Sequence, residues 1–253
     1  MASSVELFQF RFSPYNEKAR WALDLKRVPH RRTTLLPGPH IPKVRAMTGQ
    51  NATPVLRIDN ETVFGSTRIV TRLDELDPAN RLTPDNMAER ETVNAIVQRF
   101  DEDLTPRMRR AVLDANLSNL DYFARVFSGD RPAWQRFFYR LALPLARGLV
   151  RKGNGITGPA AVEDGIAAGT EAFDLVARAA AQTGYLVGDR FTLADLTAAS
   201  SLASLIDPPH PDMDRPLPRP PKLEALRARY RDHPGAAWVL EMYRKHRPGT
   251  RLS

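Results

Sequence analysis

The chain has no cysteine among its 253 residues. It therefore forms no disulfide, has no thiolate nucleophile of its own, and offers no sulfur ligand to a metal ion. Any thiol chemistry must use a thiol that a ligand brings to the protein.

Long apolar runs are also missing, because no stretch approaches the ~18 apolar residues of a membrane span. Residues 1–6 lack the basic region and the apolar run of a secretory signal. Hydrophobic residues still make up 42% of the chain, which is enough for a sizeable core in one large or two modest domains. We therefore expect a soluble, cytoplasmic protein.

The chain has fewer acidic than basic residues: 29 aspartates and glutamates against 37 lysines and arginines, which gives a net charge of +8. An arginine-rich solvated surface explains this balance, and attraction to small anions is an alternative. No helix-turn-helix, zinc finger or RNA-recognition motif accompanies the charge. The sequence therefore gives no reason to expect a nucleic acid partner.

The first third of the chain alternates between strand and helix patterns. Apolar residues on both faces of residues 5–12 indicate a central buried strand. Pro14 suits a first helical turn, because its missing N–H would have no partner there. The predicted elements are a strand at 5–12, a helix at 14–26, a strand at 28–36, a hairpin of 55–58 and 62–64, and a helix ending at Leu76.

The rest of the chain reads as helical after a proline-containing linker at 78–86, which separates domains at 1–77 and 87–253. Apolar residues recur at helical spacing from Val93 to Leu104. This face must be buried against something, and a second copy of the chain is one candidate. Thr192 and Asp195 form a capping-box signal for a further helix.

Two segments stand out by composition. Residues 131–152 carry six positive charges and no acid, beside one apolar face, and Pro144 should kink the helix. Three interpretations of this helix remain open. It packs its apolar face on the core, it lines an apolar pocket, or it touches a membrane surface. Residues 208–221 hold seven prolines and indicate a stiff, extended surface loop, with only a remote prospect of a metal site.

The stretch from Phe12 to Trp21, the Thr53-Pro54 pair and the capping box together resemble the cytosolic glutathione S-transferases, in a bacterial-type form with serine at the thiol-activating position. The resemblance implies a thioredoxin-like βαβ-ββα domain followed by an all-helical domain. It also implies glutathione as co-substrate, a small apolar electrophile, a homodimer and no metal.

The resemblance places the chemistry at the start of the first helix, where Ser13 would stabilise the glutathione thiolate. A serine hydroxyl at a helix N-terminus can donate a hydrogen bond to an anion, and the helix dipole adds to the effect. Tyr15 and Asn16 are the alternative candidates. The glutathione-binding residues that the resemblance implies are His40, Lys43, Thr53, a cis Pro54, Gly65 and Ser66.

The resemblance also implies an apolar acceptor pocket, for which the segment 131–152 offers Trp134, Phe137, Phe138 and Leu141. Gly65 lacks the acidic or amide side chain that the family usually has at this position, which weakens the expected glutathione site. Two alternatives therefore remain open. One is a ligand-binding or partner-docking protein without catalysis, and the other is a glutathione-dependent lyase or isomerase.

Overall fold

The computed structural model describes residues 4–129 and 131–249. The first domain has a four-stranded sheet in the order β2-β1-β3-β4. Strand β1 runs parallel to β2 and antiparallel to β3, and β3 and β4 form an antiparallel hairpin. The strands are β1 (Val5–Gln9), β2 (Arg31–Thr34), β3 (Val55–Ile58) and β4 (Glu61–Phe64).

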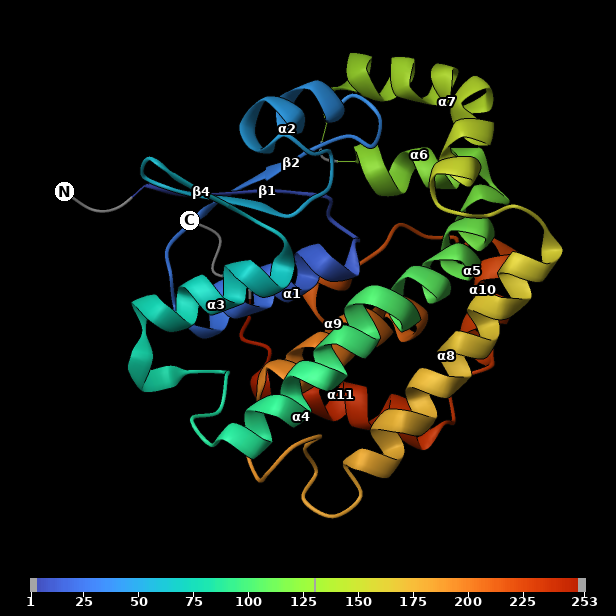
Figure 1. The fold of residues 1–253 in the computed structure, drawn as a ribbon. Coiled ribbons are helices and arrows are strands. Elements are labelled where there is room, and N and C mark those ends of the chain that lie inside the picture. Colours follow the sequence, from blue (N-terminus) through green and yellow to red (C-terminus); the bar gives the residue numbers. More distant parts are fainter. Residues whose placement is uncertain (1–3, 130, 250–253) are drawn as a thin grey trace.

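Helices cover both faces of this sheet, as Figure 1 shows. Helices α1 (Pro14–Leu25) and α3 (Ser66–Leu76) lie on one face, and α2 (Ile41–Thr48) lies on the other. Strand β1 is buried along its whole length, because Leu7 belongs to the main core with α1 and α3 while Phe8 packs with Val44 of α2. The fold is thioredoxin-like, as the sequence predicted.

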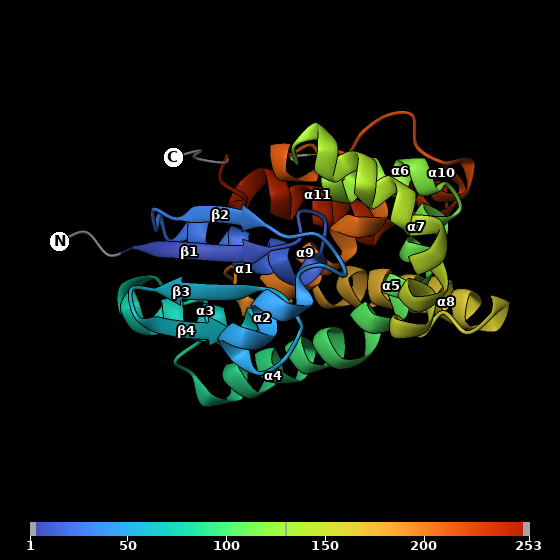
Figure 2. The same cartoon turned by 90° about the horizontal axis from the view of Figure 1, so that it is seen from above.

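The second domain is a bundle of helices, which Figure 2 shows from above. Helix α9 runs through its centre, and its residues from Leu193 to Leu205 are all buried. The elements after the sheet are η1 (Pro78–Asn80), α4 (Met87–Gln98), the π-helix η2 (Arg99–Leu104), α5 (Thr105–Leu117), α6 (Leu120–Ser128), α7 (Ala133–Gly153), α8 (Pro159–Ala179), α9 (Leu193–Ile206), η3 (Pro211–Met213), α10 (Pro221–Ala228) and α11 (Pro234–His246).

Several local predictions are confirmed. The hairpin strands are close to those expected, the Thr53–Pro54 peptide bond is cis, and the capping box at Thr192 and Asp195 is formed, with the Thr192 N–H donating to Asp195 Oδ2 over 2.9 Å. The predicted strands at 5–12 and 28–36 were too long. Helix α2 was missed because Val44 is its only buried residue, so its sequence lacks an apolar stripe.

The apolar face from Val93 to Leu104 does not need a second subunit. Val93, Phe100 and Leu104 are fully buried in the chain's own core. The face is therefore buried, as predicted, but against residues of the chain's own α9 and α1 in the same core cluster, so it gives no support for a second copy.

Helix α7 corrects a second expectation. Packing of its apolar face on the core was one interpretation of residues 131–152, but Leu143 is the only fully buried residue of the helix. The aromatic and leucine face points to solvent instead. The helix bends along its length, as Figure 1 shows. Pro144 lies inside it, and a proline within a helix removes a hydrogen bond and favours a bend.

The proline-rich segment 208–221 is not simply a surface loop, which corrects a third expectation. His210, Met213 and Arg215 are buried, and Asp212 accepts a hydrogen bond of 2.6 Å from Arg247 at the end of α11. Arg247 is itself fully buried. Asp212 also pairs with Arg32 of β2 at 2.9 Å, so the loop helps to close the interface between the two domains.

Among the residues that the structure describes, no helix is long and apolar enough to cross a membrane.

Candidate functional site

The N-termini of α1 and α3 meet at one cavity of about 480 Å³. Ser13 precedes α1, Gly65 precedes α3, and the cis peptide before Pro54 lies between them. The first N–H groups of a helix have no partner within it, so both helix ends present donors and positive potential. The lining residues are Phe10, Ser13, Tyr15, Ala52, Thr53, Pro54, Gly65, Ser66, Thr67, Arg68, Asp101 and Arg109.

Ser13 occupies the N-cap position of α1 in an extended conformation, with φ −89° and ψ 131°. Its hydroxyl makes no capping hydrogen bond to the helix. A serine at this position often satisfies one of the helix N–H groups with its own oxygen. Here the hydroxyl remains available to a group in the cavity.

Tyr15 also lines the cavity, but its hydroxyl has a partner. The phenol O–H donates to the main-chain oxygen of Asp101 over 2.8 Å. Burial raises the pKa of Tyr15 to about 12. The phenol is therefore neutral at physiological pH, and its only proton is directed at the helical domain.

Asn16 is fully buried and does not line the cavity. Its Nδ2 donates to Thr53 Oγ1 over 3.0 Å, so it ties the first turn of α1 to the loop that ends in cis Pro54. The arrangement makes Asn16 a residue that positions the loop.

The helical domain contributes charged groups that the sequence analysis missed. Asp101 lies in the π-helix η2, and its Oδ2 accepts from Lys18 Nζ at 2.8 Å and from Thr67 Oγ1 at 2.6 Å. Burial lowers the pKa of Lys18, and Asp101 opposes that effect. Asp101 Oδ1 is buried and has no hydrogen-bond partner among the described residues. π-Helical turns often mark functional sites, but the turn leaves no signal in a single sequence.

Two guanidinium groups, those of Arg68 and Arg109, complete the cavity wall. Arg68 stacks over the ring of Phe64 at 5.4 Å from the centroid. Arg109 comes from α5, and its Nε has no partner among the described residues. Both are arginines among many in this chain, so nothing in the sequence singled them out.

His40 and Lys43, which the sequence placed with the glutathione site, line a neighbouring cavity of about 440 Å³ between α2 and α7. His40 Nδ1 accepts from the Gly38 N–H at 3.1 Å, and Nε2 lies 2.9 Å from the Asn51 main-chain oxygen. Burial lowers the pKa of His40. Both ring nitrogens are therefore engaged by the main chain, and the ring is neutral.

The same second cavity includes Trp134 and Phe138 of α7. Phe137 and Leu141, which were predicted with them, lie outside it and are 63% and 65% exposed. The ring of Phe10, from the first cavity, meets the ring of His40, from the second, edge-on at 4.7 Å. The two cavities are therefore separated by one aromatic pair.

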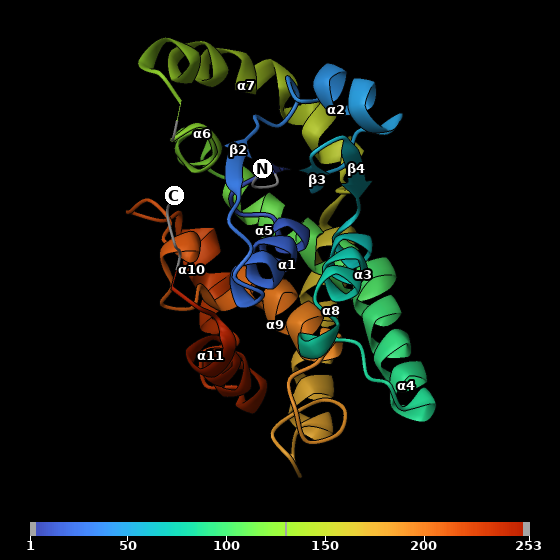
Figure 3. The same ribbon diagram turned by 90° about the vertical axis from the view of Figure 1, so that its left-hand side faces the viewer.

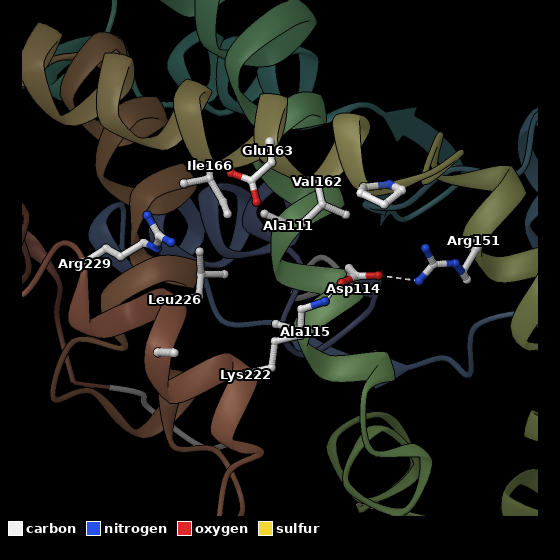
Figure 4. A pocket seen from close by; sticks show the side chains of 12 residues that line it. Ala111, Asp114, Ala115, Arg151, Val162, Glu163, Ile166, Lys222, Leu226 and Arg229 are labelled. Atoms are coloured by element: carbon white, nitrogen blue, oxygen red, sulfur yellow. Dashed lines mark hydrogen bonds and ion pairs between the residues drawn. The ribbon is translucent and has the colours of Figure 1, made fainter.

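A third cavity, of about 380 Å³, lies within the helical domain between α5, α8 and α10 (Figure 4). Asp114 lies on its wall and pairs with Arg151 and with Lys222. None of the predicted site residues lines it. No group of three or more histidine, aspartate or glutamate side chains that could hold a metal ion occurs in the described part of the chain.

Comparisons with known proteins agree with this architecture. Residues 7–81 match the family model described as glutathione S-transferase, N-terminal domain, and residues 159–233 match the model of the C-terminal domain. The two matches cover more than half of the chain. Neither includes residues 82–158, where α6 and α7 lie. No curated protein matches the sequence.

Solved structures with the same fold share little sequence. A glutathione S-transferase from Methylobacillus flagellatus with glutathione bound has a TM-score of 0.62 and 18% identity, over 96% of this chain and 95% of that one. A theta-class enzyme from Xanthomonas axonopodis with glutathione bound has a TM-score of 0.57 and 21% identity, over 99% of both. FzlA from C. crescentus has a TM-score of 0.57 and 17% identity, over 94% and 92%.

Proposed function

The chain belongs to the glutathione S-transferase family, and we propose that it binds glutathione in the cavity between α1 and α3. In this proposal the bound thiolate attacks a small apolar electrophile. The observation that carries the proposal is the convergence of two helix N-termini, the cis Pro54 loop and a hydroxyl without a capping partner on one cavity.

We propose Ser13 as the group that stabilises the thiolate. A free thiol has a pKa near 8.5 and is mostly protonated at neutral pH. A hydrogen bond from the Ser13 hydroxyl and the dipole of α1 both favour the ionised sulfur. Tyr15 is the weaker candidate, because its proton is already donated to the Asp101 main-chain oxygen.

The γ-glutamyl end of glutathione is proposed to lie at the start of α3. Its carboxylate would meet Ser66 and the first N–H groups of that helix. Gly65 has a positive φ of +88° and no side chain to offer the amine. Asp101 Oδ1, which is buried and lacks a partner among the described residues, is the acceptor that we assign to the amine.

The glycyl end and the acceptor are assigned by charge and polarity. Arg68 and Arg109 supply the positive charge that a glycyl carboxylate needs in the same cavity as Ser13. The cavity between α2 and α7, with Trp134 and Phe138, is the proposed acceptor site. Replacing Phe138 with Ser should change the preference among electrophiles and leave glutathione affinity nearly unchanged.

Retention on immobilised glutathione, with elution by free glutathione, tests the binding step. Ser13→Ala should then lower turnover about 10–100-fold at pH 7, because one hydrogen bond to an ionised group contributes ~1.5–3 kcal/mol. The loss should shrink at high pH, where the thiol ionises unaided. Full activity of Ser13→Ala together with loss in Tyr15→Phe would reverse the assignment.

A ligand-side comparison tests the role of Asp101 without disturbing the fold. Glutathione should bind about 10–100-fold more tightly than its desamino analogue, which lacks the γ-glutamyl amine. Equal affinity, measured by calorimetry, contradicts the assignment of Asp101. Retention without turnover of any electrophile would instead favour a binding protein on the transferase fold.

We also propose a homodimer, which now rests on the family alone because the Val93 to Leu104 face is buried within the chain. Light scattering tests it directly. A particle of only about 28.4 kDa at micromolar concentration contradicts the dimer.

A further inference from the structure

Helix α7 carries most of the large apolar side chains that are exposed in the described residues. Six of the ten large apolar side chains that are exposed in the described residues lie on it, each between 60% and 89% exposed. They follow helical spacing and so share one side of the helix. We call this side the outer face of α7; it consists of Trp134, Phe137, Phe138, Leu141, Leu145 and Leu149.

The exposed apolar side chains do not belong to a helix that is detached from the core. The opposite side of α7 is anchored, since Leu143 is buried and Tyr139 and Val150 pack against the main core. Figures 1 and 3 show α7 at the edge of the molecule, beside α2 and above α6. A helix held on one side with apolar residues on the other presents a surface for something outside the chain.

The charges that the α7 segment carries are all positive. From Arg131 to Lys152 the chain has six basic residues and no acidic one. Arg140 and Arg151 pair with acids elsewhere in the chain. Arg136, Arg147 and Lys152 make no ion pair with any described residue, so they are available to an external anion.

The charge pattern decides which partner fits. A second copy laid on this face would bring two strongly basic helices together, which is unfavourable. The apolar residues also project from a single helix, and only Trp134 and Phe138 contribute to a cavity wall. Tryptophan, phenylalanine and leucine on one side of a helix, with arginine and lysine elsewhere on the same helix, suit the surface of an anionic bilayer.

We propose that the outer face of α7 docks this protein on anionic lipid membranes, with the helix lying in the plane of the surface. This surface role is separate from the proposed glutathione chemistry and does not depend on it. Docking would bring the cavity between α2 and α7 to the lipid, because Trp134 and Phe138 belong to both.

The test is co-sedimentation of the full chain with vesicles of equal parts phosphatidylglycerol and phosphatidylcholine, against vesicles of phosphatidylcholine alone. We expect binding to the anionic vesicles that weakens as salt is added. Trp21 and Trp238 are buried whereas Trp134 is exposed, so a blue shift of tryptophan fluorescence on binding reports the outer face itself. The shift should disappear in Trp134→Phe.

Two sets of variants separate the contributions. Arg136→Gln with Arg147→Gln should weaken vesicle binding about 30-fold, because each cation near an anionic surface contributes roughly a fivefold factor. Phe137→Ser with Leu145→Ser should weaken it on the order of 100-fold. The matched controls are Leu76→Ser with Met87→Ser and Arg178→Gln with Arg231→Gln, which change exposed residues elsewhere and should bind as the parent does.

Three results would overturn the proposal. The first is no binding to anionic vesicles at low salt, and the second is equal loss of binding in the controls. The third is an oligomer, seen by light scattering, that Phe137→Ser with Leu145→Ser disperses, because the face would then belong to a second copy. Unfolding midpoints of all variants, measured alongside, should match the parent because every changed side chain is exposed.

Discussion

Two regions of this molecule differ in which side chains they bury: one buries charged groups, and the other exposes apolar ones. Where α1, α11 and the proline-rich segment meet, charged side chains are inside. Arg247 is fully buried and reaches Glu17 at 2.8 Å, Asp24 at 2.7 Å and Asp212 at 2.6 Å. On α7, large apolar side chains are outside. Hydropathy alone would have assigned both regions the other way.

The difference separates residues that hold the fold from residues that do not. A buried charge is tolerated only when it is paired and hydrogen-bonded, so the network around Arg247 is part of the structure. An exposed apolar residue stabilises nothing inside the chain. The outer face of α7 therefore points to a role outside folding.

Breaking the network should have the largest effect on stability. Arg247→Met leaves three buried or partly buried carboxylates with fewer partners, and we expect a loss of about 3–5 kcal/mol in the free energy of unfolding. Urea unfolding measures it. Arg244→Met, which changes an exposed arginine in the last turn of α11, is the control and should leave the midpoint unchanged. A small effect of Arg247→Met would show that the network is not structural.

A substitution on the inner side of α7 should have the next largest effect on stability. Leu143→Ala removes the one fully buried side chain of the helix and should cost about 2–3 kcal/mol, the lower part of the range for buried leucines. Unfolding followed by circular dichroism measures the loss. If the cost is negligible, α7 is not anchored as described.

Acid should lower the free energy of unfolding by an amount comparable to the loss expected for Leu143→Ala, or smaller. Burial alone would raise the pKa of Asp212, but the guanidinium groups of Arg20, Arg32 and Arg247 outweigh it and lower the pKa to about 2. Because the unfolded carboxyl titrates near 3.9, this contribution is present above about pH 4 and is lost as the pH falls toward 2, by roughly 2 kcal/mol. Asp212→Asn should flatten that part of the stability profile, and an unchanged profile contradicts the assignment.

The outer face of α7 should give the smallest effect on stability. Leu141→Ala lies two residues from Leu143 but changes an exposed side chain, so the free energy of unfolding should stay within about 0.5 kcal/mol. Leu143→Ala and Leu141→Ala therefore make the same substitution on the two sides of one helix. Equal losses at both positions would contradict the exposed placement of Leu141.

Much of the fold could be predicted because its signals are local. The hairpin and the capping box at Thr192 each depend on neighbours in the chain, whereas the cis Pro54 turn was expected from the family resemblance. Ser13 and the start of α1 were recognisable for the same reason. Helix α2 was not, because a short helix with one buried residue carries no periodic pattern.

Only some residues of the candidate site could be predicted from the sequence. Ser13, Tyr15, Thr53, Pro54, Gly65 and Ser66 were named from the sequence and share one cavity. Asp101 and Arg109 were not named, because they reach that cavity from the helical domain and their places there depend on the π-helical turn and on the position of α5 at the cavity wall. His40 and Lys43 were named, but the structure places them across an aromatic pair in the next cavity.

The sequence by itself determined the absence of a protein thiol, the order of the thioredoxin-like strands with α1 and α3, and the hydroxyl at the start of α1. Composition and local turn chemistry depend only on adjacent residues. Only the tertiary structure decided which amphipathic faces are buried. The Val93 to Leu104 face is covered by the chain's own helices, and the outer face of α7 is not. Both have the same helical period, and burial depends on what packs against a helix, which the period of a single segment does not contain.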